Sequence, residues 1–461
     1  MATRLVNIDR DTPLLLPPDL RAWVPADDMV HFVIEAVGSM SLPSLKVNRR
    51  GTGSEQYPPK TMLMLLIYCY ANGIFSSRRI EGATYRDVAV RYLTADTHPD
   101  HDTICRFRRE NFEAVSEAFL GVLQLAREMG LLKVGRVSVD GTHIAANASK
   151  DRNVRYDRAG QLDEQLQQDI AELMQQAEQA DRSEEDDGQK LPDEIARRQS
   201  LRQKMQQARR ELEARARQRA EAERAEYERK LAEREQREGR SKGPRPKPPD
   251  EQPRPEQQVN LSDPDSGLMR KSKRSSYTQS YNAQAVVDAQ PASEGGSMLI
   301  LGGHVTSCAS DANELIPALQ SVPEPIGKPT AVLADTGYVN VEVIEQLQQD
   351  ARSPEPYVAV GRDDNQDRRR YDYRPRSATN KPAKKVTDPT LVAMKQKLQT
   401  DEGRAVYAQR KQTVEPVFGI IKNVIGFTRF SLRGHAKVSG EWSLVRLAYN
   451  VKRLWALQTA G

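Results

Sequence analysis

The sequence predicts an α/β protein in which a sheet domain follows a helical amino-terminal region and is interrupted by a long charged insertion. From residue 275 onward, short apolar and β-branched runs alternate with helical patterns, which is typical of an α/β sheet. Residues 1–134 have mostly helical patterns, and narrow apolar stripes in a charged background fill residues 150–240. The chain has 461 residues, which is enough for two or three structural units.

The composition indicates a partly solvated protein. The hydrophobic fraction is 38% and the charged fraction 29%, so part of the chain is expected to lie outside a core. A net charge of +5 fits nucleic-acid binding, although such an excess is also common in proteins with other partners. Cys69, Cys105 and Cys308 have no metal-ligand spacing, which argues against a zinc finger and fits a reducing cytoplasm. The first residues carry no apolar signal region, so we expect a soluble, intracellular protein.

A helical DNA-binding domain is predicted over residues 1–134. Pro58 and Pro59 are expected to open a buried helix through the apolar stretch 61–70. This stretch is too short to span a bilayer, so no membrane partner is expected.

The second half of this domain contains a candidate DNA-reading helix. Asp102 is expected to cap a helix over 102–111 that displays Arg106 and Arg109. With a short helix around 85–90 before it, the pattern resembles a helix-turn-helix whose second helix enters the major groove. An ordinary helical bundle with a basic surface face is the alternative.

Residues 150–240 are predicted to form an inserted charged coiled coil. Two stripes of apolar residues at spacings of three to four flank a polar turn at 181–188, which predicts an antiparallel hairpin. One long exposed or partly disordered helix is the alternative. Residues 241–258 are rich in proline and are expected to be an extended linker. The stripes are Leu162, Leu166, Ile170, Leu173 and Ala177, then Leu201, Met205, Ala208 and Leu212.

The sheet domain is predicted from the strand and helix patterns on both sides of the insertion. Residues 363–400 are polar and contain prolines, so a loop is expected there, and the last sixty residues are expected to be helical. The predicted strands are 137–140, 281–287, 298–301 with 303–306, 329–333 and 357–360, with helices at 312–319 and 339–349.

Three carboxylates stand out against apolar surroundings. Asp140 and Asp335 each end a predicted strand, and Glu415 enters an apolar helical segment. Carboxylates that meet at a sheet edge raise one another's pKa unless a divalent cation compensates them, an arrangement used in two-metal phosphoryl transfer. Each also has an ordinary explanation as a turn, cap or helix-opening residue. Asp288 and Asp311 are rival acids, but Asp288 precedes an ordinary turn and Asp311 is expected to cap the helix 312–319.

The order and setting of these acids resemble the DDE transposases of bacterial insertion sequences. Tyr407, Arg410, Glu415 and Lys422 resemble the family's tyrosine–arginine–glutamate–lysine signature, with six residues between Glu415 and Lys422. The gap from Arg410 to Glu415 is one residue longer than the commonest form, so Lys411 is an alternative for the arginine. The resemblance spans roughly residues 20–150 and 260–455, including a second strand similar to residues 280–284.

The resemblance implies a ribonuclease H-like catalytic domain over residues 135–149 and 259–461, with a mixed sheet and flanking helices. It implies that Asp140, Asp335 and Glu415 hold two Mg²⁺ ions, for which Mn²⁺ can substitute. Lys422, Tyr407 and Arg410, or Lys411 in the place of Arg410, are then expected to contact DNA phosphates. Arg106 and Arg109 are the DNA-binding candidates of the helix-turn-helix pattern.

The leading hypothesis is therefore an insertion-sequence transposase that cleaves DNA at the element ends and joins those ends to target DNA. Its partners would be double-stranded DNA with terminal inverted repeats, target DNA and a second copy of the chain, in a homodimer or higher assembly near the nucleoid. A ribonuclease H-like nuclease without strand transfer and a non-catalytic DNA-binding relic are the alternatives. Cut-and-paste and copying pathways share the same acids and stay open.

Overall fold

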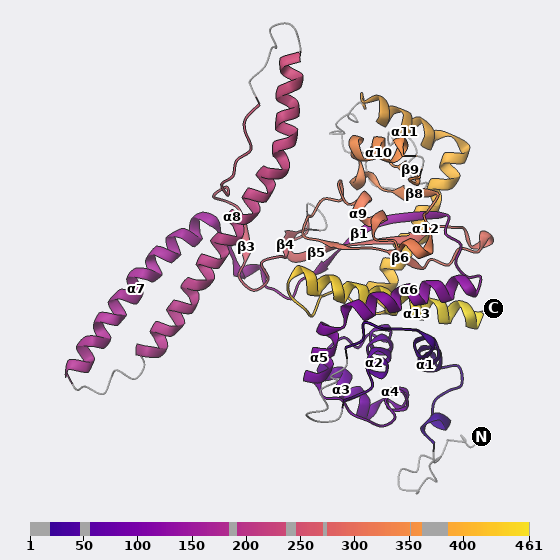
Figure 1. Ribbon diagram of the computed structural model, residues 1–461, viewed down its shortest axis with the longest axis horizontal. Helices are drawn as coiled ribbons and strands as arrows, with labels where there is room; N and C mark the ends of the chain where they lie inside the picture. The colour runs from indigo at the N-terminus through magenta and orange to yellow at the C-terminus, as the bar shows by residue number, and fades with distance from the viewer. Residues whose placement is uncertain are drawn as a thin grey trace, which may run out of the picture.

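The computed structural model describes residues 19–46, 56–183, 191–236, 246–270, 274–350, 352–361 and 386–460. A mixed sheet lies at the centre, helices cover both of its faces, and a bundle of amino-terminal helices lies below (Figure 1). Two long helices project from one end of the sheet. The predicted mixed α/β class is confirmed.

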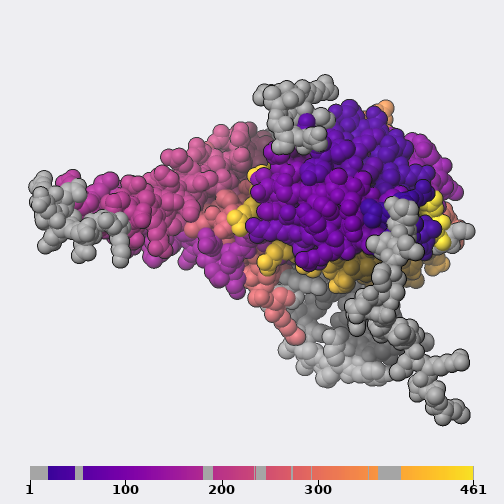
Figure 2. All heavy atoms as spheres, turned by 90° about the horizontal axis from the view of Figure 1, so that it is seen from below, coloured from indigo at the N-terminus to yellow at the C-terminus, as the bar shows by residue number. Residues whose placement is uncertain are grey.

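The amino-terminal helices pack around α2 (Pro59–Ala71). Residues 62–71 of this helix are all buried, and Pro59 occupies its first turn, so the predicted buried helix is confirmed. Viewed from below, residues of this region form a broad face beside the projecting helices (Figure 2). The other elements are η1 (Leu20–Trp23), α1 (Met29–Ser39), α3 (Ser77–Arg86), α4 (Val88–Leu93), α5 (His101–Glu110) and α6 (Phe112–Glu128).

Two predicted details of this region are wrong. Asp100, not Asp102, caps α5, because its side chain accepts a hydrogen bond of 2.8 Å from the backbone N–H of Thr103. The predicted helix at 85–90 is split by Asp87, whose φ of −98° and ψ of 121° are extended. The Asp87 side chain caps α4 instead, since aspartate competes for backbone N–H groups and favours caps over helix interiors.

The sheet is built on β1 (Arg136–Ala145), and its strand order is β4-β5-β1-β8-β9. β5 (Thr278–Asp288) runs antiparallel to β1, whereas β8 (Ala331–Ala334) is parallel to β1 and β9 (Glu355–Val358) is parallel to β8. The short strands β4 (Gly267–Met269), β7 (Val305–Thr306) and β6 (Ile300–Gly302) pair in succession along the other edge of β5.

β1 is longer than predicted, so the prediction that Asp140 ends a strand is wrong. β5 provides antiparallel partners to β1 as far as Ala145, which pairs with Ser280. The parallel neighbour β8 stops at Ala334, however, and Asp335 follows it directly. Asp140 therefore lies in mid-strand but at the level where the adjacent parallel strand ends.

Two long helices of the carboxyl-terminal region pack on the sheet. The Thr413 side chain of α12 (Asp401–Gly419) hydrogen bonds to that of Ser138 on β1 at 3.0 Å. α13 (His435–Ala460) buries Trp442, whose indole N–H donates to the Gln284 carbonyl at 3.0 Å. The remaining helical segments are η2 (Lys150–Arg152), η4 (Ala292–Glu294), α9 (Leu315–Gln320), η5 (Glu324–Ile326), η6 (Thr336–Tyr338), α10 (Val341–Gln349), α11 (Pro389–Gln399) and a π-helix (Ile420–Val424).

Part of the loop predicted at 363–400 is a helix. Residues 389–399 form α11, capped by Asp388, whose side chain accepts hydrogen bonds from the backbone N–H groups of Thr390 and Leu391. Pro389 occupies the first turn, where its missing N–H costs nothing, so a proline taken as a loop signal starts a helix instead. Residues 363–385 of the predicted loop lie outside the described residues.

The insertion contains two helices that pack side by side, α7 (Tyr156–Ser183) and α8 (Leu191–Gln236). The Arg202 guanidinium hydrogen bonds to Asp163 at 3.0 Å, and Arg198 lies 3.8 Å from Asp169, so the helices run antiparallel. They share a small apolar core separate from that of the sheet, and residues 184–188 of the predicted turn lie outside the described residues. The buried residues of that core are Val154, Ala159, Leu166, Met205, Ala208, Leu212 and Val259.

A two-stranded ladder forms the base of this arm, which we define as residues 156–236. β2 (Asn153–Arg155) pairs antiparallel with β3 (Gln258–Asn260). Asn260 is fully buried, and its amide donates to the Ser149 carbonyl at 2.7 Å and to the Asn153 side chain at 2.9 Å. The chain thus leaves and re-enters the sheet domain through one hydrogen-bonded neck.

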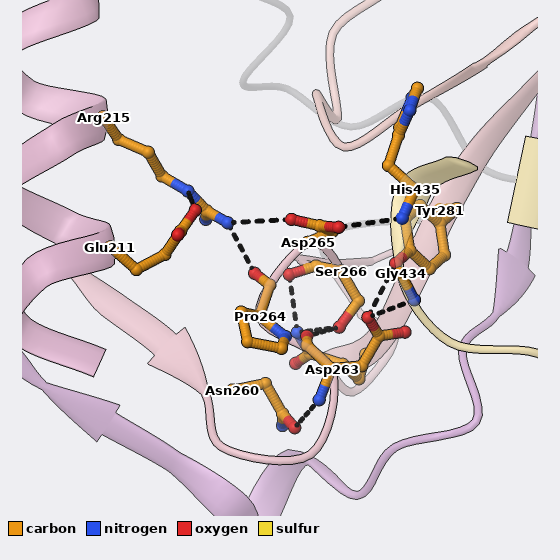
Figure 3. Close-up of polar contacts among 11 residues, drawn as sticks. Glu211, Arg215, Asn260, Asp263, Pro264, Asp265, Ser266, Tyr281, Gly434 and His435 are labelled. Atoms are coloured by element: carbon orange, nitrogen blue, oxygen red, sulfur yellow. Dashed lines mark hydrogen bonds and ion pairs between the residues drawn. The ribbon is translucent and has the colours of Figure 1, made fainter. Parts of the chain in front are cut away.

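Polar contacts tie the arm to the loop before α13 (Figure 3). Arg215 of α8 lies 3.5 Å from Asp265, whose carboxylate also accepts the His435 backbone N–H at 2.8 Å. The carboxylate of Asp263, which is fully buried, accepts the Gly434 N–H at 3.0 Å. The orientation of the arm is therefore fixed by contacts with the sheet domain as well as by its neck.

Candidate active site

Strand register brings Asp140 and Asp335 together. Ser138 on β1 pairs with Leu333 on β8 in parallel, and each acid lies two residues further along its own chain. Because side chains alternate along extended backbone, Asp140 shares the sheet face of Ser138, and Asp335, whose backbone is still extended, shares that of Leu333. This is the face on which Thr413 of α12 packs against Ser138.

α12 carries the third acid and a cation to the same place. The Arg410 guanidinium lies 3.3 Å from the carboxylate of Asp140 and 3.5 Å from that of Glu415. Arg410 is buried and hydrogen bonds to Tyr407, whereas Lys411 is exposed. Of the two basic candidates, Arg410 is therefore the one that lies among the acids.

The pKa of Asp140 shows how the three groups act on each other. Burial raises the pKa of Asp140 to about 6, Arg410 opposes the rise and Asp335 adds to it. The ionised carboxylate of Asp140 is therefore incompletely compensated, and a further positive charge at this place would be favourable.

Lys422 lies on the π-helix that follows α12, so the regular helix does not continue from Glu415 to Lys422. Its ammonium donates to the Thr142 hydroxyl at 2.5 Å and to the His143 carbonyl at 2.9 Å. Lys422 is thus anchored to β1 close to Asp140. π-Helical turns occur frequently at functional sites because they shift the register of the side chains beyond them.

The structure overturns the predicted role of Asp311 as a helix cap. α9 begins at Leu315, and the Asp311 carboxylate instead accepts hydrogen bonds of 2.7 Å from the side chains of Asn282 and Gln284. These two amides point from one face of β5. The sequence did contain the signal, since two polar residues at a spacing of two interrupt the apolar strand 281–287.

Other candidates are distributed as follows. Arg106 and Arg109 are exposed on α5, far along the chain from the three acids, whereas Arg108 between them is buried. Asp288 accepts hydrogen bonds from the backbone and side chain of Ser297, so it stabilises a turn as expected.

The oxygen atoms of the three acids are of the kind that binds divalent cations. Asp140, Asp335 and Glu415 offer carboxylate oxygens, which hard divalent ions prefer, and Asp140 and Asp335 repel each other. Among the described residues, no three acidic, histidine or cysteine side chains are grouped closely enough to hold a metal ion. Arg410 lies between Asp140 and Glu415 instead, so metal binding requires the Arg410 side chain to share or release Asp140.

Two family models match the chain. Residues 18–110 match the model described as Transposase domain (DUF772), and residues 367–455 match the model described as Transposase DDE domain. The resemblance to DDE-type transposases of insertion sequences is confirmed. The first transposase match contains α5, and the second contains α12 with Arg410 and Glu415. Asp140 and Asp335 lie outside both matched segments.

The transposase matches support a transposase function and a DNA-cleaving class of enzyme. No curated protein and no solved structure shows significant similarity to the chain. In the described parts of the chain, no helix has the length and apolar character needed to cross a membrane.

Proposed function

We propose that the chain is an active DDE transposase that cleaves DNA at element ends and joins them to target DNA. The observation that carries the proposal is the meeting of Asp140, Asp335, Arg410 and Glu415, which come from two adjacent strands and from a helix inside the DDE match. Phosphodiester cleavage depends mainly on positioning and charge neutralisation, so a small group of acids on rigid elements is sufficient.

Asp140, Asp335 and Glu415 would hold two Mg²⁺ ions, or Mn²⁺ in their place. When bound, such ions activate the attacking oxygen and stabilise the leaving oxygen of an in-line displacement. Arg410 keeps the acids together through its two ion pairs. Tyr407 hydrogen bonds to Arg410 and thereby orients it, and Lys411 is exposed, so a DNA phosphate can reach it.

The catalytic domain proposed for residues 135–149 and 259–461 is ribonuclease H-like. The order of the strands in the sheet supports this. β6 and β7 pair antiparallel with β5, β5 pairs antiparallel with β1, and the parallel strands β8 and β9 follow on the other side of β1. Residues 1–134 are proposed as a DNA-binding domain that uses Arg106 and Arg109. Residues 150–240 are proposed as a coiled-coil insertion, followed by the linker 241–258.

Double-stranded DNA with terminal inverted repeats and target DNA are the proposed substrates, and a homodimer or higher assembly is the proposed active form, since two DNA ends must be paired. The proposed location is the bacterial cytoplasm, in association with the nucleoid.

The test uses purified protein and a plasmid that carries the gene with its natural flanking DNA, in Mg²⁺ or in EDTA. We expect Mg²⁺-dependent cuts at both element ends and joined products from the wild type, and neither from Asp335→Ala. Asp350→Ala, an acid in the exposed turn after α10, is the matched control and should react like the wild type. Cuts without joining would indicate a nuclease, and DNA binding without any cuts would indicate a relic.

A further inference from the structure

Asp311 lies in the segment between β7 and α9, beside the site but on the opposite side of β1 from α12. Its Oδ1 accepts the amide N–H groups of Asn282 and Gln284, both at 2.7 Å. Gln284 in turn accepts a hydrogen bond from the hydroxyl of Tyr338, three residues after Asp335. One network therefore joins β5, the Asp311 segment and the turn that carries Asp335.

Two glycines show how closely Asp311 approaches the acids. A Cβ added to Gly141, the residue after Asp140, would lie 2.6 Å from Oδ1 of Asp311. A Cβ added to Gly337 would lie 2.9 Å from Oδ1 of Asp335 and 3.3 Å from Oδ2 of Asp311. The carboxylates of Asp335 and Asp311 thus border the same point, which a side chain at 337 would fill, and Asp311 also lies against β1 at Gly141.

A buried oxygen without a hydrogen-bond partner lies at the Gly141 side of Asp311. Asn282 is 1% exposed, and its amide nitrogen donates to Asp311 and to the Cys308 carbonyl, which fixes the orientation of the side chain. Among the described residues, its Oδ1 has no hydrogen-bond partner, and it would lie 2.8 Å from a Cβ on Gly141. Leaving a buried acceptor unpaired is costly, so a group that interacts with oxygen is expected here.

The negative charge of Asp311 is not needed for this network. Asn282 and Gln284 require an acceptor, and a neutral asparagine at 311 would supply one. The charge instead adds to that of Asp140 and Asp335, while the ion pairs of Arg410 go to Asp140 and Glu415. Like charges held this close are stabilised by a cation that they share.

We propose that Asp311 is a fourth carboxylate of the active site and that its side chain moves together with those of Asp140 and Asp335 to bind a divalent cation, since among the described residues no three acids already lie close enough to hold one. The proposal rests on the proposed function, since it assumes that this site binds such an ion. Oxygen ligands suit Mg²⁺ and Mn²⁺, and Asn282 Oδ1 is a further oxygen on the Gly141 side.

The experiment titrates Mn²⁺ into the full-length protein without DNA and measures bound Mn²⁺ by calorimetry and by electron paramagnetic resonance. Asp311→Asn keeps the acceptor and removes the charge, and should weaken the Mn²⁺ affinity about tenfold or more. Asp335→Ala should weaken it as well. Asp288→Asn, which alters a buried acid at the other end of β5, should bind Mn²⁺ like the wild type.

A second measurement is the rise in melting temperature that Mn²⁺ causes, with each variant compared with itself in EDTA. A lower starting stability of Asp311→Asn then does not obscure the result, and we expect a smaller rise than in the wild type. If Asp311→Asn binds Mn²⁺ as the wild type does while Asp335→Ala does not, Asp311 is an anchor for Asn282 and Gln284, and the proposed function is unaffected. If the wild type binds no Mn²⁺, both proposals fail.

Discussion

Asp140 is a partly buried acid, and the one cation in contact with it does not fully compensate its charge. Arg410 lies 3.3 Å away, yet burial and the neighbouring Asp335 still raise the pKa of Asp140 to about 6. A carboxyl with a raised pKa stabilises the folded protein when it is protonated and loses that contribution as it ionises. The ionised Asp140 therefore lowers the stability of the folded protein at neutral pH. Such a loss of stability is common at residues that have a chemical role.

Replacing Asp140 with asparagine should stabilise the metal-free protein at high pH. The ordinary pKa of an aspartate in an unfolded chain is about 4, so the wild type loses stability relative to Asp140→Asn as the pH rises from about 4 to about 6. Above about pH 7 the difference should stay constant at about 3 kcal/mol. Urea unfolding in EDTA at pH 4 and at pH 8 measures it. A variant that is less stable than the wild type at pH 8 would show that Arg410 outweighs burial.

The pairing of Asp140 and Asp335 could be predicted from the sequence more readily than their surroundings. The order of the acids along the chain, and their positions after apolar runs, are local properties that the sequence displays. The choice between Arg410 and Lys411 depends on the rotation of α12 against the sheet, which residue spacing alone does not determine. The role of Asp311 depends on contacts between segments nearly thirty residues apart, and a cap was the simpler local explanation.

α5 has two faces with different roles. Arg106 and Arg109 are exposed, whereas Arg108 is 4% exposed and donates to the Tyr70 hydroxyl at 2.8 Å and to the Phe75 carbonyl at 2.9 Å. Neighbouring arginines on one helix therefore separate into two solvent-facing cations and one that holds the helix to α2.

Arg106 and Arg109 should affect DNA binding without affecting stability. Replacing both with alanine removes two candidate phosphate contacts, so the slope of log affinity against log salt concentration should fall by about 2. The free energy of unfolding should change by less than about 0.5 kcal/mol, because both side chains are exposed. Fluorescence anisotropy with labelled element-end DNA at several salt concentrations measures the slope. An unchanged slope would place DNA elsewhere.

Arg108→Met should destabilise the protein strongly. Glu441 of α13 is fully buried, lies 4.0 Å from Arg108 and accepts a hydrogen bond from Tyr70, so removing the cation leaves a buried carboxylate uncompensated. The expected loss is about 3–5 kcal/mol in urea unfolding. Combining Arg108→Met with Glu441→Gln should cost clearly less than the sum of the two single changes, and simple additivity would mean that the two side chains do not interact.

The prediction of elements succeeded where the apolar pattern was strong and failed at the ends of elements. α2 was predicted from a continuous apolar run and β5 from an apolar run that two polar residues interrupt, and the structure confirms both. β1 extends five residues beyond its predicted end at residue 140, because antiparallel pairing with β5 continues through polar residues such as Thr142 and His143. Such pairing is a tertiary interaction, and the local sequence does not display it.

At the scale of the whole molecule, the arm and the sheet domain have separate apolar cores. The main core contains no described residue between 156 and 236, whereas α7 and α8 bury Leu166, Met205 and Leu212 against each other. Farther along α7, Met174 is 47% exposed, and Leu201 of α8 is 41% exposed. Apolar side chains exposed on a projecting helix pair are a reasonable place for contact with a second copy of the chain.

Shortening the arm should therefore separate stability from assembly. Replacing residues 167–198 with a short Gly-Ser linker keeps Leu166 and the Asp163–Arg202 pair, so the neck and the small core near it stay intact. The main melting transition should move by no more than about 2 °C, because the sheet core loses no contact. If the arm pairs two copies, the mass in light scattering should fall from dimer to monomer, and Met174→Gln should weaken the dimer in the same direction. A large drop in the melting temperature would contradict the separation of the two cores. An unchanged mass would place the contact between copies on another surface, such as the exposed end of α8 that this deletion leaves in place.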